Sequence, residues 1–131
     1  MAIIPTAEQI QELMKGPADM PVVMVNLLKF KSQADESEGD VPGVVAYQRY
    51  GEKMREFVES KGGRFIWSGR ADSQVIGTGG EDFDVIALVE YPSRAAFLKI
   101  VSDPYVEKEI GKHRAAGLEM QWLIATTEAP S

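Results

Sequence analysis

The chain has 131 residues, a formal net charge of -6 and a sequence pI near 4.8. This acidic balance removes the basic field that supplies most non-specific affinity for nucleic acid, so we expect no nucleic-acid partner. The sequence contains no cysteine, which excludes disulfides, thiolate metal ligands and cysteine nucleophiles. It also shows neither a signal peptide nor an apolar run long enough to cross a membrane, so we expect a cytoplasmic protein.

The length fits one domain over residues 1–131, and the chain begins with a short helix outside the main pattern. Thr6 and Gln9 have the spacing of a capping box, and Ile10 and Leu13 follow at helical spacing. We therefore expect a helix at about residues 6–15, followed by a core at about residues 20–127.

Residues 22–30 form an almost continuous apolar run, which predicts a strand covered on both faces. If Val23, Val25 and Leu27 face the helices, Asn26 points to the opposite face of the sheet. Residues 32–43 are acidic and poor in apolar side chains, so we expect a mobile loop there.

A helix is predicted from Val44 to the Gly62-Gly63 pair, because its apolar residues recur at helical spacing. Residues 64–76 then alternate as a strand, with Trp67 on the helix-facing side. The turn at 77–80 leads into a strand at 83–91, whose helix-facing residues are Val85, Ala87 and Val89.

Ser93 has the position of an N-cap, and the helix that follows is interrupted at Asp103-Pro104 before a second helix at about 105–116. Residues 118–127 read as the last strand. This order predicts a ferredoxin-like βαββαβ α+β fold, with a four-stranded antiparallel sheet and the helices on one face.

The other face of this sheet is too apolar to remain in water. We expect it to carry Met24, Leu28, Phe30, Ile66, Ile86, Leu88, Met120, Trp122 and Ile124. A second copy would cover it and form a homodimeric α+β barrel. A common interface buries about 1,600 Å² in total.

The chain resembles the dimeric α+β-barrel family known as domain of unknown function 1330. The likeness lies in short segments of matching order and spacing: 25–28, Tyr47, Tyr50, 62–64, 83–84, 91–93, 103–105 and Arg114. It implies the fold and a homodimer but no agreed reaction. The wider superfamily is similar to cofactor-free monooxygenases, muconolactone isomerases and haem-degrading oxygenases, which is an analogy of fold.

Two residues are candidates for catalysis in the cleft between the sheets of such a dimer. Asp84 is the best carboxylate for a general base, and Asn26 could orient a carbonyl or enolate oxygen. The alternatives are an Asp84 that caps a loop and an Asn26 amide satisfied by neighbouring groups.

Arginines and one tryptophan are the candidates for substrate binding. Arg64, Arg70 and Arg114 could each bind a carboxylate, and Trp122 could form an aromatic wall. Pairing along the hairpin predicts an ion pair between Arg70 and Glu90 instead, and Arg114 has a buried ion pair as its alternative. For Trp67, packing against a helix is the favoured interpretation.

His113 is the only histidine, and with no cysteine it does not supply a zinc or facial-triad site from one chain. We expect no metal and no cofactor; a haem held by His113 ranks last, behind a simple role near a helix end.

The leading hypothesis is a homodimer whose inter-sheet cleft binds a small organic acid or aromatic compound, with cofactor-free oxygenation or isomerisation if it is an enzyme. The alternative is a non-catalytic binding protein or structural dimer. No residue pattern names the ligand or the reaction.

Overall fold

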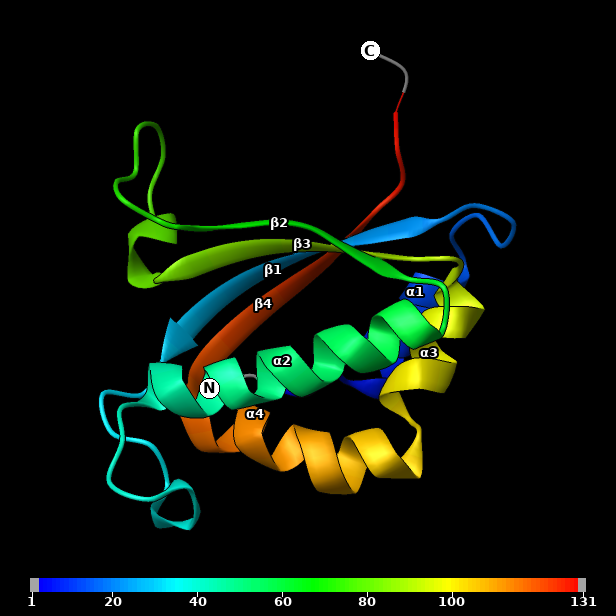
Figure 1. Ribbon diagram of the computed structural model, residues 1–131. Helices are drawn as coiled ribbons and strands as arrows, with labels where there is room; N and C mark the ends of the chain where they lie inside the picture. Colours follow the sequence, from blue (N-terminus) through cyan, green and yellow to red (C-terminus); the bar gives the residue numbers. More distant parts are fainter. Residues whose placement is uncertain (1–2, 130–131) are drawn as a thin grey trace.

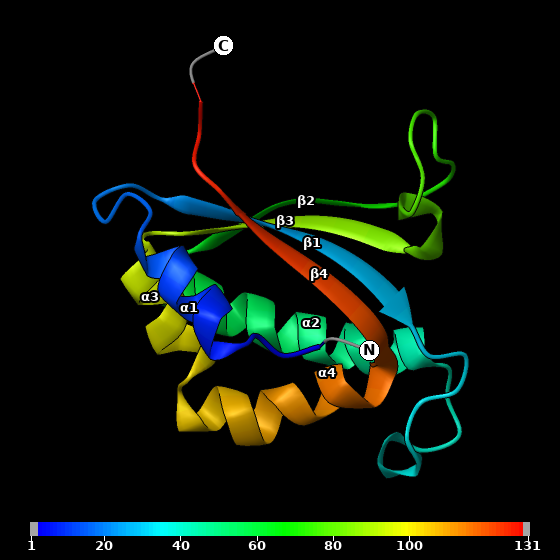
Figure 2. The same cartoon turned by 180° about the vertical axis from the view of Figure 1, so that it is seen from behind.

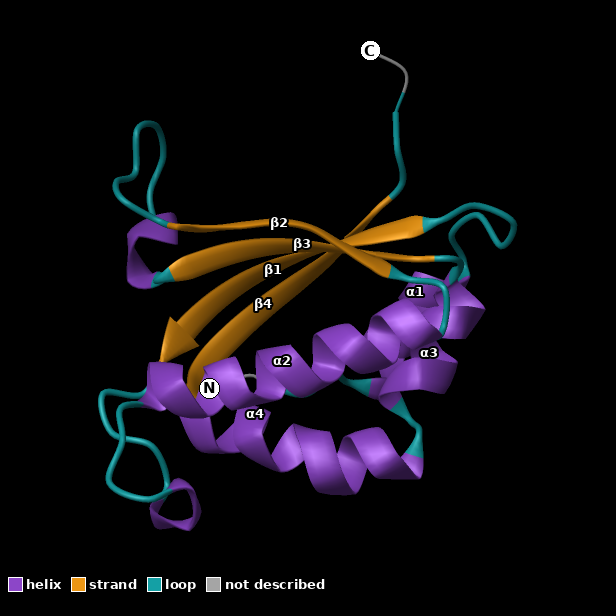
Figure 3. Ribbon diagram, viewed as in Figure 1, coloured by secondary structure: helices purple, strands orange, loops and turns teal. Residues whose placement is uncertain are grey.

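The computed structural model describes residues 3–129 and contains one four-stranded sheet. The strands are β1 (Val22–Phe30), β2 (Arg64–Arg70), β3 (Val85–Tyr91) and β4 (Leu118–Thr126), and their order in the sheet is β2-β3-β1-β4 with every pair antiparallel. The helices α1 (Ala7–Met14), α2 (Gly43–Ser60), α3 (Arg94–Val101) and α4 (Gly111–Gly117) lie on one side of this sheet (Figure 1, Figure 3). The predicted ferredoxin-like βαββαβ arrangement is confirmed.

The predicted helix boundaries depend on local signals that the structure shows directly. The Thr6 side chain accepts from the backbone N–H of Gln9, and the Gln9 side chain accepts from that of Thr6, which completes the capping box of α1. Ser93 caps α3 by accepting from the N–H of Ala96. A π-helical turn at Val106–Ile110 joins the segment after α3 to α4.

The hydrophobic core lies between the helices and the face of the sheet that we call the inner face. On β1 the buried side chains are Val22, Met24 and Leu28, and their neighbours across β3 are Tyr91, Val89 and Val85. The prediction that Val23, Val25 and Leu27 face the helices is therefore wrong for β1, while the inner residues of β3 were predicted correctly. Met24, Asn26, Leu28 and Phe30 belong to the inner face.

A β-bulge at Ile66 changes the face of the following residue in β2. Phe65 pairs with Val89, but the next paired residue is Trp67, opposite Leu88. This extra residue turns Trp67 to the outer face, where it is 56% exposed, so its predicted packing against a helix is wrong.

The strand β2 ends at Arg70, six residues earlier than the alternation predicted. Arg70 consequently lies opposite Val85, and Arg64 is the residue opposite Glu90. The predicted Arg70–Glu90 pair is wrong for this reason; Arg64 donates to Glu90 instead, at 2.8 Å.

The acidic segment between β1 and α2 is packed against the helices, contrary to the prediction of a mobile loop. Ala34 and Glu38 are buried, and the backbone N–H of Asp35 donates to the carbonyl of Ala116 at the end of α4. None of the described helices has the length and apolar character needed to span a bilayer.

Candidate functional site

Asn26 lies on β1, one of the two central strands, and faces the helices, so it does not line a cleft between two sheets as predicted. Its Nδ2 donates to the carbonyls of Met24 and Ala87, each at 3.3 Å, and its Oδ1 accepts from Nε2 of Gln121 at 2.8 Å. All of its hydrogen-bonding groups are thus engaged, which makes Asn26 an anchor for Gln121.

Gln121 connects Asn26 to Arg114, the one predicted binding arginine that lies on the inner side. Its Oε1 accepts from Nε of Arg114 at 3.2 Å and from Nη2 at 2.6 Å. The Nη2 group also donates to the carbonyl of Ile3, in the segment that leads into α1 (Figure 2).

The guanidinium of Arg114 is only part-buried, yet within residues 3–129 no carboxylate lies at ion-pair distance from it. Its partners are the neutral oxygens of Gln121 and Ile3. The buried ion pair, which the sequence left open for Arg114, is therefore not what the described structure contains.

Two tyrosines from α2 lie close enough to Arg114 for its charge to act on them. Tyr47 and Tyr50 are one helical turn apart, with ring centroids 5.1 Å from each other, and Phe30 packs against Tyr47 at 5.2 Å. Burial raises the pKa of both hydroxyls above the ordinary tyrosine value, and the positive charge of Arg114 opposes this only in part. Both phenols consequently stay neutral and able to donate.

The hydroxyls of Tyr47 and Tyr50 have no hydrogen-bond partner among the described residues. In that same part of the chain, the only fully enclosed side-chain polar atom that lacks a partner is Nε of Arg94. Each phenol O–H is therefore left to donate to water or to a ligand oxygen.

We call Asn26, Gln121, Arg114, Tyr47 and Tyr50 the Arg114 cluster. It combines one cation with neutral donors and contains no carboxylate or imidazole. Such a group can bind and stabilise an anionic oxygen, but none of its own members is a general base at neutral pH.

The other predicted site residues are not brought to this cluster. Asp84 is exposed and its Oδ2 accepts from the N–H of Phe30 at 2.9 Å, so it caps a strand end, which was its alternative role. Arg64 is exposed on the outer face beside Glu90, and Arg70 is exposed at 3.7 Å from Asp72. The general-base role of Asp84 has no support from this geometry.

Trp122 lies on the outer face, as predicted, and packs edge-on against Phe83 with centroids 4.8 Å apart. It is 48% exposed. A hollow of about 490 Å³ opens nearby, with Leu27, Ile86 and Phe83 among its apolar residues and Arg70 on its lining.

His113 is engaged in a charged network that joins α4 to α2 and to the acidic loop. Its Nδ1 lies 2.8 Å from both carboxylate oxygens of Glu38, and Arg49 donates to the same carboxylate at 3.1 Å. Nζ of Lys53 is 3.1 Å from Nε2 of His113. Because both ring nitrogens are occupied and the side chain is 13% exposed, His113 is poorly placed to bind a haem iron.

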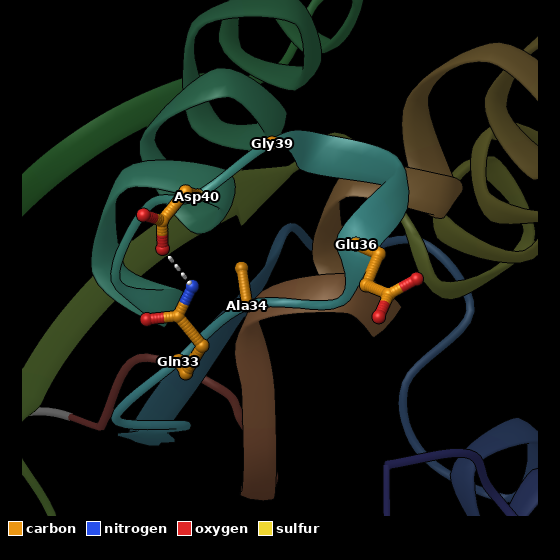
Figure 4. A pocket seen from close by; sticks show the side chains of 5 residues that line it. All are labelled: Gln33, Ala34, Glu36, Gly39 and Asp40. Carbon is orange, nitrogen blue, oxygen red and sulfur yellow. Dashed lines mark hydrogen bonds between the residues drawn. The ribbon is translucent and has the colours of Figure 1, made fainter.

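A second hollow, of about 480 Å³, lies within the acidic loop (Figure 4). Gln33 donates to Asp40 at 2.9 Å, and Glu36 points away from this pair. The side chains of Gln33 and Asp40 thus hydrogen-bond to each other. Across the described residues, no group of three or more His, Asp or Glu side chains is arranged to hold a metal ion.

The sequence matches the model of a family described as Domain of unknown function (DUF1330) over residues 38–127, more than half of the chain. The chain belongs to the DUF1330 family. Its match includes four members of the Arg114 cluster, all except Asn26, while α1 and β1 lie before it. No curated protein matches the chain.

A solved protein of unknown function from Rhodopseudomonas palustris, RPA0582, is 32% identical to this DUF1330 chain. The match covers 98% of each chain with a TM-score of 0.85. The fold therefore extends over the N-terminal region that the family match does not include.

Two more distant structures share the fold alone. SnoaB, a cofactor-independent oxygenase from Streptomyces nogalater, is 12% identical, with 86% of this chain and 96% of that chain covered and a TM-score of 0.55. A dimeric protein of unknown function with a ferredoxin-like fold from Bacteroides fragilis is 14% identical, with 86% and 100% covered and a TM-score of 0.51.

Sequence reasoning missed Gln121 and the role of the two tyrosines. Gln121 alternates with Met120 and Trp122, which were assigned to the outer face, so a polar residue on the inner side of β4 was visible in the sequence. Tyr47 and Tyr50 belonged to the resemblance but were not assigned to a site. Nothing in the sequence indicated that Glu38 would be buried, because its partners come from α2 and α4.

Proposed function

We propose that the protein binds a small organic anion at the Arg114 cluster. The observation that carries this proposal is a part-buried guanidinium whose described partners are all neutral. A carboxylate, enolate or phenolate oxygen would supply the missing negative charge and accept from Arg114.

The two tyrosines support the same ligand chemistry. Their hydroxyls remain protonated and have no hydrogen-bond partner among the described residues, so each can donate to an anionic oxygen held by Arg114. Their rings, with Phe30 beside them, give an apolar aromatic wall suited to the body of an aromatic acid.

The experiment is calorimetric titration of the full chain with benzoate and salicylate, with benzamide as the neutral isostere. We expect the acids to bind more tightly than benzamide. Arg114→Gln should weaken acid binding roughly 10- to 100-fold, since a hydrogen bond to a charged group contributes about 1.5–3 kcal/mol.

Arg64→Gln is the matched control, because Arg64 is an exposed arginine on the outer face. It should leave acid binding unchanged. Equal binding of benzoate and benzamide, or equal losses in the two variants, would contradict the proposed site.

Cofactor-independent oxygenation is a second candidate function, favoured by the donors that surround Arg114. Such donors would stabilise the enolate of a substrate that itself gives electrons to O₂. The fold shared with the Streptomyces oxygenase is consistent with this chemistry. Oxygen uptake with 1-phenylbutane-1,3-dione, slowed by Arg114→Gln, is the expected result; uptake equal to that of buffer would exclude this activity for the enolisable ketone.

We also infer that two copies associate through their outer sheet faces. Trp67, Trp122 and Ile124 are 56%, 48% and 49% exposed on this face, which is a large apolar surface for a monomer. The dimeric relative from Bacteroides fragilis has the same fold. Sedimentation should show a dimer for the native chain and a monomer for Trp122→Glu.

A further inference from the structure

The connection between β2 and β3, residues 71–84, rises on the outer side of the sheet (Figure 1, Figure 2). We call it the arm. Near its tip, Val75 and Ile76 are each 87% exposed, more than any other large apolar side chain among the described residues. Two adjacent aliphatic side chains so fully in water need a physical reason.

The arm has internal structure that holds this tip in place. Nε2 of Gln74 donates to the carbonyl of Ile76 at 2.6 Å, and the N–H of Gly79 donates to Glu81 at 2.8 Å. Gly77 and Gly79 have positive φ angles of 85° and 103°, which glycine adopts at little cost.

The base of the arm is anchored on the sheet. Phe83 is 3% exposed and packs against Trp122, while the N–H of Ala71 donates to the carbonyl of Asp84 at 2.9 Å. The exposed apolar tip is therefore presented by an ordered support.

The hollow of about 490 Å³ lies where the arm meets the outer face. Leu27 and Ile86 come from the sheet, and Val75 and Phe83 come from the arm. The arm and the outer face thus form one continuous apolar surface, so a partner that covers the face also reaches the hollow.

We propose that the arm packs against a second copy of this chain. The Val75-Ile76 tip of each protomer packs on its partner, and the hollow receives an apolar side chain of that partner. This inference rests on the proposed dimer through the outer faces. In a two-fold pair, both arms make the same contact.

The exposure of Ile76 favours a second copy over a small ligand. Val75 lines the hollow, but Ile76 does not, so a molecule bound in the hollow would leave Ile76 in water. A protein surface that continues from the outer face covers both side chains.

The first test is sedimentation equilibrium of the full chain over a dilution series. The double variant Val75→Ser with Ile76→Ser should raise the dimer dissociation constant roughly tenfold or more. In the proposed dimer, it removes two aliphatic side chains per protomer that the interface buries. Val44→Ser, an exposed valine on α2, is the control and should leave the constant unchanged.

A second test uses the absence of cysteine from the chain. Ile76→Cys provides a single thiol for a bimane label, whose emission should shift to shorter wavelength as the dimer forms; the same label at Val44→Cys should not respond.

The outcomes separate the arm from the dimer. The native chain could form a dimer whose dissociation constant is unaffected by the double variant, with a label at position 76 that stays in water. This result would contradict the contact between the arm and the second copy, but it would leave the dimer through the outer faces intact. A native chain that is monomeric at every concentration overturns both.

Discussion

Glu38 is a buried carboxylate that depends on three side chains from two helices. His113 and Arg49 contact it directly, and Lys53 approaches the opposite nitrogen of His113. Because an ionised carboxylate can only accept, Nδ1–H of His113 donates to Glu38. The network fastens the acidic loop to α2 and α4.

This network predicts acid-sensitive stability. Burial alone would raise the pKa of Glu38, but the hydrogen bonds and charges of His113 and Arg49 outweigh it, so the pKa lies below the ordinary value of 4.5. Ionised Glu38 therefore stabilises the fold above pH 4.5, and this contribution is lost as the pH falls through the lowered pKa.

We expect Glu38→Gln to lower the free energy of unfolding by about 1–3 kcal/mol at pH 7, because a buried charged acceptor is replaced. Urea denaturation at pH 7, 5, 4 and 3 should show the difference from the native chain shrinking below pH 4.5. Glu36→Gln, in the same turn but exposed, should change little. A difference that stays constant down to pH 3 would contradict the assignment.

At the level of elements, the sequence predicted the order of strands and helices better than the face of the sheet on which each side chain lies. Each strand and helix of the βαββαβ pattern was predicted because its period and end signals are local, as at Thr6 and Ser93. In β1, however, both alternating sets are apolar, so period alone could not say which set meets the helices. Asn26 was placed on the outer face because Val23, Val25 and Leu27 were assigned to the helices, whereas Gln121 and two carbonyls satisfy it on the inner face.

The errors in β2 come from pairing that no local signal reveals. The bulge at Ile66 inserts one residue without a glycine to indicate it, and Trp67 changes face as a result. Val75-Ile76 resembled a strand end, which shifted the hairpin count and paired Arg70 with Glu90.

The candidate site was predicted only in part: Asn26 and Arg114 were identified, but the tertiary contacts that join them through Gln121 were not.

The crossing of α2 and α4 predicts opposite effects for two glycines. A Cβ on Gly117 would overlap the carbonyl oxygen of Gly43 and lie 2.9 Å from the backbone nitrogen of Tyr47, so neither neighbour can yield by rotating a side chain. Gly51 is also helical, but a Cβ there meets nothing within 4 Å.

Gly117→Ala should lower the free energy of unfolding by about 1–3 kcal/mol, and Gly51→Ala should raise it by about 1 kcal/mol. Chemical denaturation of both variants beside the native chain measures this. Equal stability of the two variants would show that α2 and α4 do not cross in close backbone contact.

In the whole molecule, the two faces of one sheet carry separate roles. The inner face holds the Arg114 cluster beneath the helices, and the outer face carries the apolar surface that we assign to a second copy. A ligand site on the inner side needs no residue from the partner, so we expect Trp122→Glu to abolish association while acid binding at Arg114 persists.

Both tryptophans of the chain, Trp67 and Trp122, lie on the outer face, so intrinsic fluorescence reports on that face alone. Association through the outer face transfers both indoles from water into an apolar interface. We expect the emission maximum to move to shorter wavelength, and acrylamide quenching to fall, as protein concentration rises through the dissociation constant. The control is Val44→Ser, which should follow the native curve. Sedimentation as a dimer with emission that does not depend on concentration would place the interface on another surface.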